Sequence, residues 1–217
     1  MKLMRLSPRF TIAVAALVAC TSVAFVSAGV FRSDPYPSWQ GNGISQKLNL
    51  FTFYEEKDGL KVFVSAEVMR FHDKETYVPM LISVGNNNSK PVLMTPEEFV
   101  LTDDKGVYYP LAKHEDLLSE YKKSGFDANL LKNSEFLGNK FVAFQRVPSL
   151  FYPNFTATGV RNERIQLPQG TYLVDMLYFR KPIGPLEGRI FTLTVYFPQQ
   201  ETQMDVRFVV PGKPARR

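Results

Sequence analysis

Apolar and polar residues alternate with a period of two over most of the chain from residue 48 onward. In the segment 60–71, Val62, Val64 and Val68 fall on one side, and polar side chains such as Ser65 and Glu67 fall on the other. Successive side chains of a strand point to opposite faces of the sheet, so this alternation predicts an antiparallel strand with one buried face.

The same alternation recurs in short segments separated by Gly, Pro, Asn and Asp. Further strands are expected at 48–55, 77–84, 99–101, 107–111, 141–147, 171–180, 189–197 and 203–210. Both faces of 171–180 are apolar, which predicts a central position for that strand. About eight or nine short strands with such turns indicate a mainly β fold, an antiparallel sandwich or barrel.

One segment follows a helical pattern instead. In His114–Lys123, Leu117, Leu118 and Tyr121 recur at helical spacing, acidic residues come first and lysines last, as the helix dipole favours. A second helical turn is expected at 127–134, so residues 113–139 form a helical insertion between strands. Its apolar side is most often packed on the sandwich, and the alternative is a partner-binding groove that includes Leu117 and Tyr121.

Two groups of motifs resemble a known family. The first is Phe99–Tyr109 (FVLTDDKGVYY), which follows a strand that ends in an Asn-rich turn. The second is Leu167–Gly170 (LPQG) leading to Leu177–Phe179 (LYF). Both are similar to the extracytoplasmic immunoglobulin-like domains of bacterial lipoproteins. The resemblance implies an immunoglobulin-like sandwich and an extracytoplasmic location, but no catalytic residues.

The N-terminal 31 residues have the features of an export signal. A basic stretch of nine residues precedes an uncharged, largely apolar segment at 10–31. Three interpretations remain open: a lipobox at Leu17–Cys20 with lipid attachment to Cys20, a cleavage site at Val26–Ala28, or an uncleaved membrane anchor. All three place the rest of the chain outside the cytoplasm, membrane-tethered in the first and third, in the periplasm or on the outer face of the cell membrane.

Composition and charge then divide the chain into four parts. We expect a signal or anchor at 1–31, a Pro- and Gly-rich tether at 32–43, the sandwich domain at 44–211 and a basic tail at 212–217. The 26 basic and 21 acidic residues give a net charge of +5, and Lys2, Arg5 and Arg9 account for three of these charges. The surplus of +2 that remains is well dispersed, so we expect no nucleic-acid partner.

The residue types needed for common catalytic and metal sites are scarce. One cysteine and two histidines offer little for a zinc site or a Cys/His catalytic pair. The acidic doublet Asp103–Asp104 precedes Lys-Gly, where aspartate stabilises a turn, and weak calcium binding there is the alternative. We therefore expect a protein that is not an enzyme, with no cofactor and no metal.

Aromatic residues concentrate between residues 141 and 155, with Pro and Arg among them. Phe151, Tyr152 and Phe155 are candidates for a partner-binding surface, because aromatics with Pro and Arg are typical of recognition sites. The alternative is an ordinary core of large aromatic side chains, which dominate cores by area.

These patterns predict a membrane-tethered, exported protein that acts as a non-catalytic protein-interaction or assembly module of the bacterial cell envelope. Its partner would be another envelope protein that contacts an exposed sheet edge or the aromatic loop. The alternatives are an extracytoplasmic hydrolase with carboxylates assembled by the fold, and a purely structural subunit of an envelope complex. A deep pocket with two facing acids, or a buried His–Asp pair, would favour the enzyme.

Overall fold

The computed structural model describes residues 43–132, 137, 140–149, 151–152 and 162–212. The chain divides into two units, 1–38 and 39–217, and the described residues all belong to the second. The expected signal or anchor, the Cys20 lipid site, nearly all of the tether, Phe155 and most of the basic tail lie outside the described residues. Among those residues, no helix combines the length and the apolar character needed to cross a membrane.

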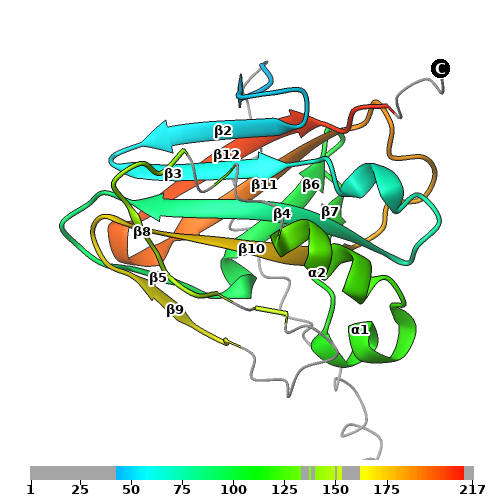
Figure 1. The fold of residues 1–217 in the computed structure, drawn as a ribbon. Coiled ribbons are helices and arrows are strands. Elements are labelled where there is room, and N and C mark those ends of the chain that lie inside the picture. The colour runs from blue at the N-terminus through cyan, green and yellow to red at the C-terminus, as the bar shows by residue number, and fades with distance from the viewer. Residues whose placement is uncertain (1–42, 133–136, 138–139, 150, 153–161, 213–217) are drawn as a thin grey trace, which may run out of the picture. The chain divides into compact units, whose positions relative to one another are not determined.

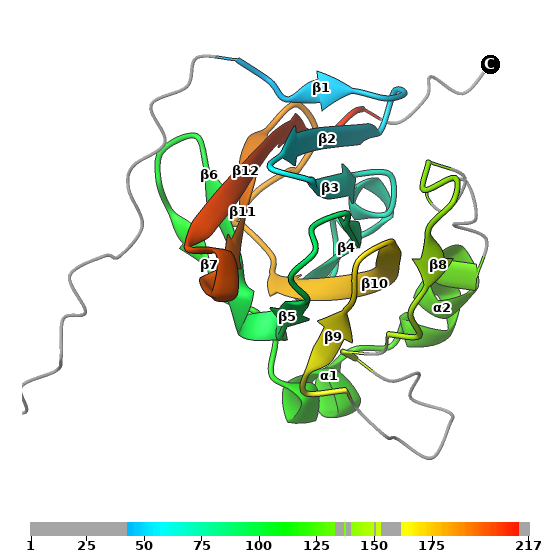
Figure 2. The ribbon, with the colours of Figure 1, turned by 90° about the vertical axis from the view of Figure 1, so that its left-hand side faces the viewer.

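Two sheets pack face to face, as Figures 1 and 2 show. In the described part of the chain, the larger sheet has the order β1 (Gln46–Lys47), β2 (Thr52–Lys57), β3 (Leu60–Ser65), β4 (Tyr77–Asn86), β10 (Thr171–Arg180) and β8 (Gln145–Arg146). The smaller sheet has the order β12 (Thr202–Val209), β11 (Ile190–Phe197), β6 (Phe99–Asp103) and β7 (Tyr108–Tyr109). Strand pairs within both sheets are antiparallel, except that β8 runs parallel to β10. The mainly β, antiparallel expectation is confirmed, and two separate sheets exclude the barrel.

Smaller elements complete the described part. A two-stranded sheet pairs β5 (Val92–Met94) with β9 (Ile165–Leu167). Three single-turn 3-10 helices are η1 (Met69–Phe71), η2 (Pro96–Glu98) and η3 (Pro198–Gln200). The helical insertion contains α1 (His114–Glu120) and α2 (Ser124–Lys132), and α2 lies over the outer face of the larger sheet beside β10 (Figure 1).

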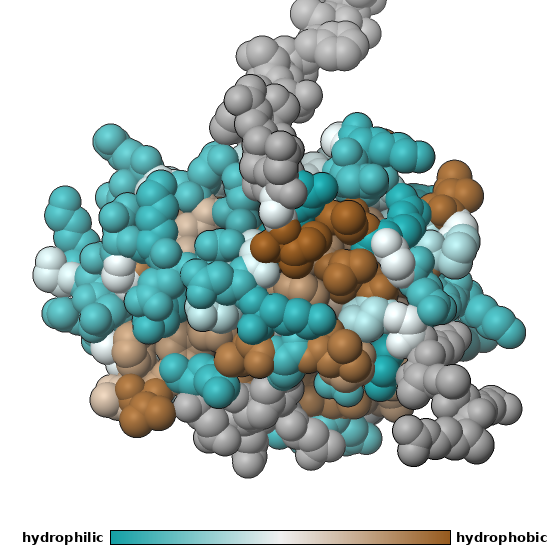
Figure 3. Space-filling model, turned by 90° about the horizontal axis from the view of Figure 1, so that it is seen from above, coloured by the Kyte–Doolittle hydropathy of each residue, from teal (hydrophilic) through white to brown (hydrophobic). Residues whose placement is uncertain are grey.

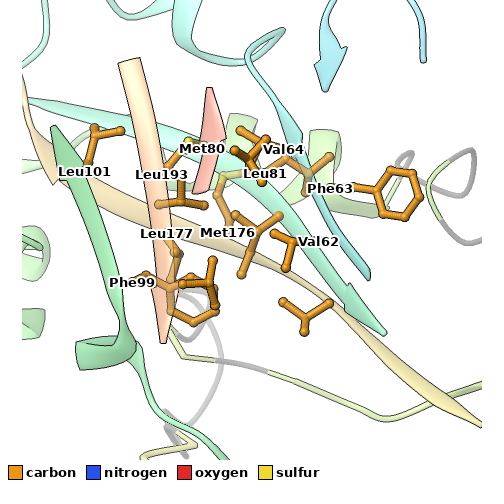
Figure 4. Close-up of a cluster of buried hydrophobic side chains, with 14 of the residues drawn as sticks. Val62, Phe63, Val64, Met80, Leu81, Phe99, Leu101, Met176, Leu177 and Leu193 are labelled. Atoms are coloured by element: carbon orange, nitrogen blue, oxygen red, sulfur yellow. The ribbon is translucent and has the colours of Figure 1, made fainter. Parts of the chain in front are cut away.

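The core between the sheets follows from the alternation along the strands. Val62, Val64 and Met80 from the larger sheet face Leu101 and Leu193 from the smaller one, and all of them are buried (Figure 4). Aromatic rings close the two ends of this layer. Phe53 lies 6.2 Å from Phe208, and Phe99 lies 6.1 Å from Phe151. Burial of this apolar area supplies the main favourable term in folding.

The outer face of the larger sheet is also buried, because the helical insertion covers it. Phe141 stacks on Tyr172 at 4.6 Å and contacts Phe63 edge-on at 5.2 Å. Its ring occupies the place of a side chain at Gly85, where a Cβ would come within 2.1 Å of the ring. A larger residue at position 85 would therefore displace Phe141. The strand expected at 141–147 is wrong for Phe141, which anchors a turn, and β8 is limited to two residues.

Candidate functional site

The four described residues expected to form a partner surface are all interior. The exposed fractions are 0% for Leu117, 6% for Tyr121, 0% for Phe151 and 7% for Tyr152. Phe151 inserts into the core between the sheets, and Tyr121 and Tyr152 pack edge-on against Tyr178 of β10. The expectation of an exposed contact surface is therefore wrong for these four side chains, and the alternative of core packing holds.

The free edge of β10 is covered as well. Val147 N donates to Tyr172 O, and Ser149 Oγ donates to Val174 O. Further along, Ala112 N donates to Tyr178 O. These contacts occupy the backbone groups that an added strand would need, so the expected docking at an exposed sheet edge does not apply to β10.

Where the backbone pairing along this edge is interrupted, the side chain of Asp175 takes the place of a backbone hydrogen-bond acceptor. Its carboxylate accepts hydrogen bonds from Phe151 N at 2.9 Å and from Met176 N at 2.7 Å, one on each oxygen. Burial raises the pKa of Asp175 to about 6, although these two N–H groups act to lower it. Asp175 therefore fixes the position of Phe151 and carries a titratable group into the core.

A second buried cluster joins the helical insertion to the sandwich. His72 follows η1, Asp127 lies on α2, and Tyr121 lies between the two helices. His72 Nε2 is 3.0 Å from Asp127 Oδ1, and Tyr121 OH donates a short hydrogen bond to Asp127 Oδ2. Both the histidine and the aspartate are 0% exposed.

The contacts of His72 show which of its ring nitrogens carries a hydrogen. His72 Nδ1 is 2.8 Å from Val68 O, and a carbonyl oxygen only accepts, so Nδ1 carries a hydrogen. A neutral His72 would then turn the lone pair of Nε2 toward a carboxylate oxygen 3.0 Å away. The two atoms are in close contact, but neither makes a hydrogen bond, so the pair is a contact between two buried polar groups.

Tyrosine rings enclose the His72–Asp127 pair. Burial, followed by the hydrogen bond to Asp127, raises the pKa of Tyr121 far above its usual value, and burial also raises that of Tyr178. General acid–base catalysis requires the catalytic atom within hydrogen-bond reach of the substrate. Both members of the pair are fully buried, and their contacts connect α2 to η1.

At another part of the surface, the hydrogen bonds of Arg189 fix the backbone of an exposed loop. Arg189 joins two loops: its Nη2 donates to Asp103 Oδ2 at 3.0 Å and to Tyr109 OH at 3.0 Å, and its Nη1 donates to Ile183 O at 3.1 Å. Tyr109 OH also donates to Asp103 Oδ2, at 2.7 Å.

Asp103 holds the neighbouring turn at the same time. Its Oδ1 accepts from Lys105 N at 3.0 Å and from Val107 N at 2.9 Å, which confirms the expected turn role of this aspartate. Burial acts to raise the pKa of Asp103, but the hydrogen bonds from Tyr109, Val107 and Lys105 outweigh it and the pKa lies below its usual value. One carboxylate thus connects the turn 104–107 to the loop 181–188.

These two loops frame a shallow hollow of about 480 Å³. It is lined by Asp104, Lys105, Ile183, Pro185, Glu187, Gly188, Arg189 and Ile190. Ile183 is 100% exposed, and Val107 on the neighbouring turn is 48% exposed. We call the residues Val107, Ile183 and Pro185, with the hollow between the loops, the loop surface. The sequence indicated the turn at Asp103–Asp104 but gave no signal for Arg189, which is 86 residues away.

No group of three or more His, Cys, Asp or Glu side chains suited to a metal ion occurs in the described residues. Asp104, for which weak calcium binding was the alternative, lines the hollow beside Lys105 instead.

Comparison with known proteins gives few matches. No family model matches the chain, and no curated protein does. Two solved structures have similar chain paths. YcdA, a candidate lipoprotein of Bacillus subtilis, has 10% identity and a TM-score of 0.38 over 72% of this chain. A protein of unknown function from Listeria monocytogenes has 12% identity and a TM-score of 0.38 over 75% of this chain and 84% of its own. The chain spans 38% of the length of YcdA. Likenesses this weak assign no function, and the immunoglobulin-like expectation is not confirmed.

Proposed function

We propose that this protein is an exported, membrane-tethered, non-catalytic interaction module of the bacterial cell envelope, and that its partner binds the loop surface. The uncharged segment 10–31 behind a basic stretch supports export and tethering. Export by this route exposes residues 43–212 to the envelope, where the partner would be another envelope protein.

The observation that carries the proposal is the set of hydrogen bonds that fixes the backbone of the loop surface. Ile183 extends fully into solvent, yet the carbonyl of that residue is held by Arg189, which is itself fixed by Asp103. An exposed aliphatic side chain on a fixed loop loses little conformational freedom on binding, so more of the contact energy becomes affinity. Lys105 and Glu187 around the hollow provide a charged rim that suits a polypeptide partner.

The hydrolase is supported by one feature, the buried His72–Asp127 pair, because a His–Asp pair is a common catalytic element. The described contacts favour a structural role for the pair, in which it connects α2 to η1. Nδ1 of the histidine is hydrogen-bonded to Val68 O, and the aspartate accepts a hydrogen bond from Tyr121. A hydrolase would require α2 to move away before substrate could reach the imidazole.

Photo-crosslinking in living cells tests the loop surface. A photoreactive phenylalanine analogue at position 183 is expected to form one discrete crosslink to an envelope protein. The same analogue at Val142, which is 82% exposed, serves as the control and should not form it. Because Ile183 is the most exposed aliphatic side chain of the surface, Ile183→Asp should weaken binding of the identified partner roughly tenfold, with the melting temperature unchanged.

Two outcomes would contradict the proposal. One is a crosslink pattern that is the same at positions 183 and 142. The other is a partner whose binding survives Ile183→Asp but is lost with Val142→Asp, since that would locate the contact on the turn at 141–144.

A further inference from the structure

A second set of exposed apolar side chains lies near the point where the described chain begins. Ile44 is 42% exposed, Leu50 59%, Phe71 40% and Phe126 47%. Figure 3 looks onto this end of the domain and shows hydrophobic residues gathered on its surface among hydrophilic ones. We call Ile44, Leu50, Phe51, Phe71 and Phe126 the tether-side patch.

Direct contacts connect most of this patch, although its residues come from three separate segments. The Arg70 guanidinium lies 4.4 Å from the ring centroid of Phe51 and 4.7 Å from that of Phe71. Phe71 in turn contacts Phe126 of α2 at 6.1 Å. An arginine between two aromatic rings joins the turn after β1 to η1, so the patch is a continuous surface at this point.

The backbone of the β1–β2 turn presents Leu50 outward. Asn49 Oδ1 accepts hydrogen bonds from Phe51 N and Thr52 N, both at 2.8 Å. An asparagine side chain bonded in this way stabilises a tight turn. Leu50 is therefore held at the tip of a fixed turn, and its side chain can insert from there into an apolar environment.

Basic side chains lie at the patch: Lys123 Nζ donates to Phe71 O and also pairs with Glu75 at 3.0 Å. Residues 43–54 contain Lys47 and no acidic residue, and Arg70 lies within the patch itself. Glu67 lies 3.7 Å from Arg70 and offsets part of that charge. Apolar and aromatic side chains with adjacent Lys and Arg suit the interface of a bilayer that contains anionic phospholipids, where the rings lie at headgroup depth.

We propose that the tether-side patch rests on the surface of the membrane that holds the N-terminal segment. This inference depends on the membrane tethering in the proposed function. Residues 32–42 extend at most about 40 Å, and the 22 residues after Cys20 about 75 Å, so Gly43 stays within that range of the bilayer. At the high effective concentration that such a tether imposes, a weak interfacial contact is enough to orient the domain.

A second copy of this chain is the competing occupant. Stable dimers bury about 800 Å² per partner, which is more than a few part-exposed side chains provide.

Fluorescence quenching tests this orientation with the full-length chain. Trp39 is the one tryptophan in the sequence, so Trp39→Phe gives a dark background. Leu50→Trp and, as the control, Val142→Trp are introduced separately on that background. Each protein is reconstituted into phosphatidylglycerol-containing vesicles whose acyl chains carry bromine near the headgroups. We expect about twofold quenching and a blue-shifted emission at position 50, and neither change at position 142.

Vesicle flotation separates the failure of this inference from the failure of tethering. If the protein floats but the fluorophore at position 50 is unquenched, or is quenched no more than at 142, the membrane contact is refuted and the tether remains. If the protein does not float, both proposals fail. A blue shift at position 50 that increases with protein concentration, without quenching by bromolipid, would identify a second copy as the occupant and overturn the lipid assignment.

Discussion

Asp127→Ala is expected to lower the free energy of unfolding by about 3–5 kcal/mol, whereas Asp127→Asn is expected to cost less than about 1 kcal/mol. Alanine leaves the buried His72 Nε2 and the Tyr121 hydroxyl without their partner. Asparagine keeps both contacts, because its Nδ2 can donate to Nε2 while its Oδ1 accepts from Tyr121.

Urea unfolding followed by near-ultraviolet circular dichroism measures both variants. Glu115→Gln makes the same acid-to-amide change at an exposed position of α1 and should be within about 0.5 kcal/mol of the parent. Equal losses for Asp127→Ala and Asp127→Asn would show that the carboxylate charge, rather than the arrangement of donors and acceptors, stabilises the cluster.

Asp175→Asn, in contrast to Asp127→Asn, is expected to lower the free energy of unfolding by about 2–3 kcal/mol. Both oxygens of Asp175 face backbone N–H donors, from Phe151 and Met176. An asparagine amide would turn its own N–H groups toward one of these donors and leave it unpaired in the core. Asp127 and Asp175 are both buried aspartates, so their contrast is a direct test of the described hydrogen bonds.

Asp175 also makes the stability of the domain depend on pH. Its pKa is about 6 in the folded protein, against 3.8 as the ordinary value. Between these pH values the folded state binds more protons than the unfolded state. The stabilising contribution of Asp175 is therefore complete below about pH 4 and is lost as pH rises through 6. The loss approaches about 3 kcal/mol, at 1.36 kcal/mol per pKa unit.

The stability difference between the parent and Asp175→Asn, measured by urea unfolding from pH 4 to pH 7, isolates this group from the other carboxylates. It should be largest at pH 4 and decrease toward pH 6. A difference that stays constant with pH, or that grows as pH rises, would contradict a raised pKa at Asp175.

The strands could be predicted where one face of each strand is apolar. The segment 171–180 agrees with β10 at both ends. Between the strands expected at 48–55 and 60–71, Asp58 and Gly59 have φ of 49° and 74°, as a tight hairpin needs. The short strands β1, β5 and β9 were missed, because two or three residues are too few to show a period of two.

The site residues were harder to predict, since aromatic content does not distinguish a core from a surface. Phe151 is interior because its N–H bonds Asp175 of β10 and its ring packs on Phe99, contacts that depend on the sheet order rather than on its neighbours in sequence. The pairing of His72 with Asp127 and of Asp103 with Arg189 joins residues far apart in the chain. No local pattern marks such partners, so only the packed structure identifies them.

Protease accessibility in intact spheroplasts tests the account most directly, because every functional proposal depends on residues 43–212 lying outside the cytoplasm. We expect the protein to sediment with membranes, and added protease to degrade the domain without lysis of the spheroplasts, while a cytoplasmic marker survives. Full-length chain recovered in the soluble cytoplasmic fraction, protected from protease until the cells are lysed, would contradict it.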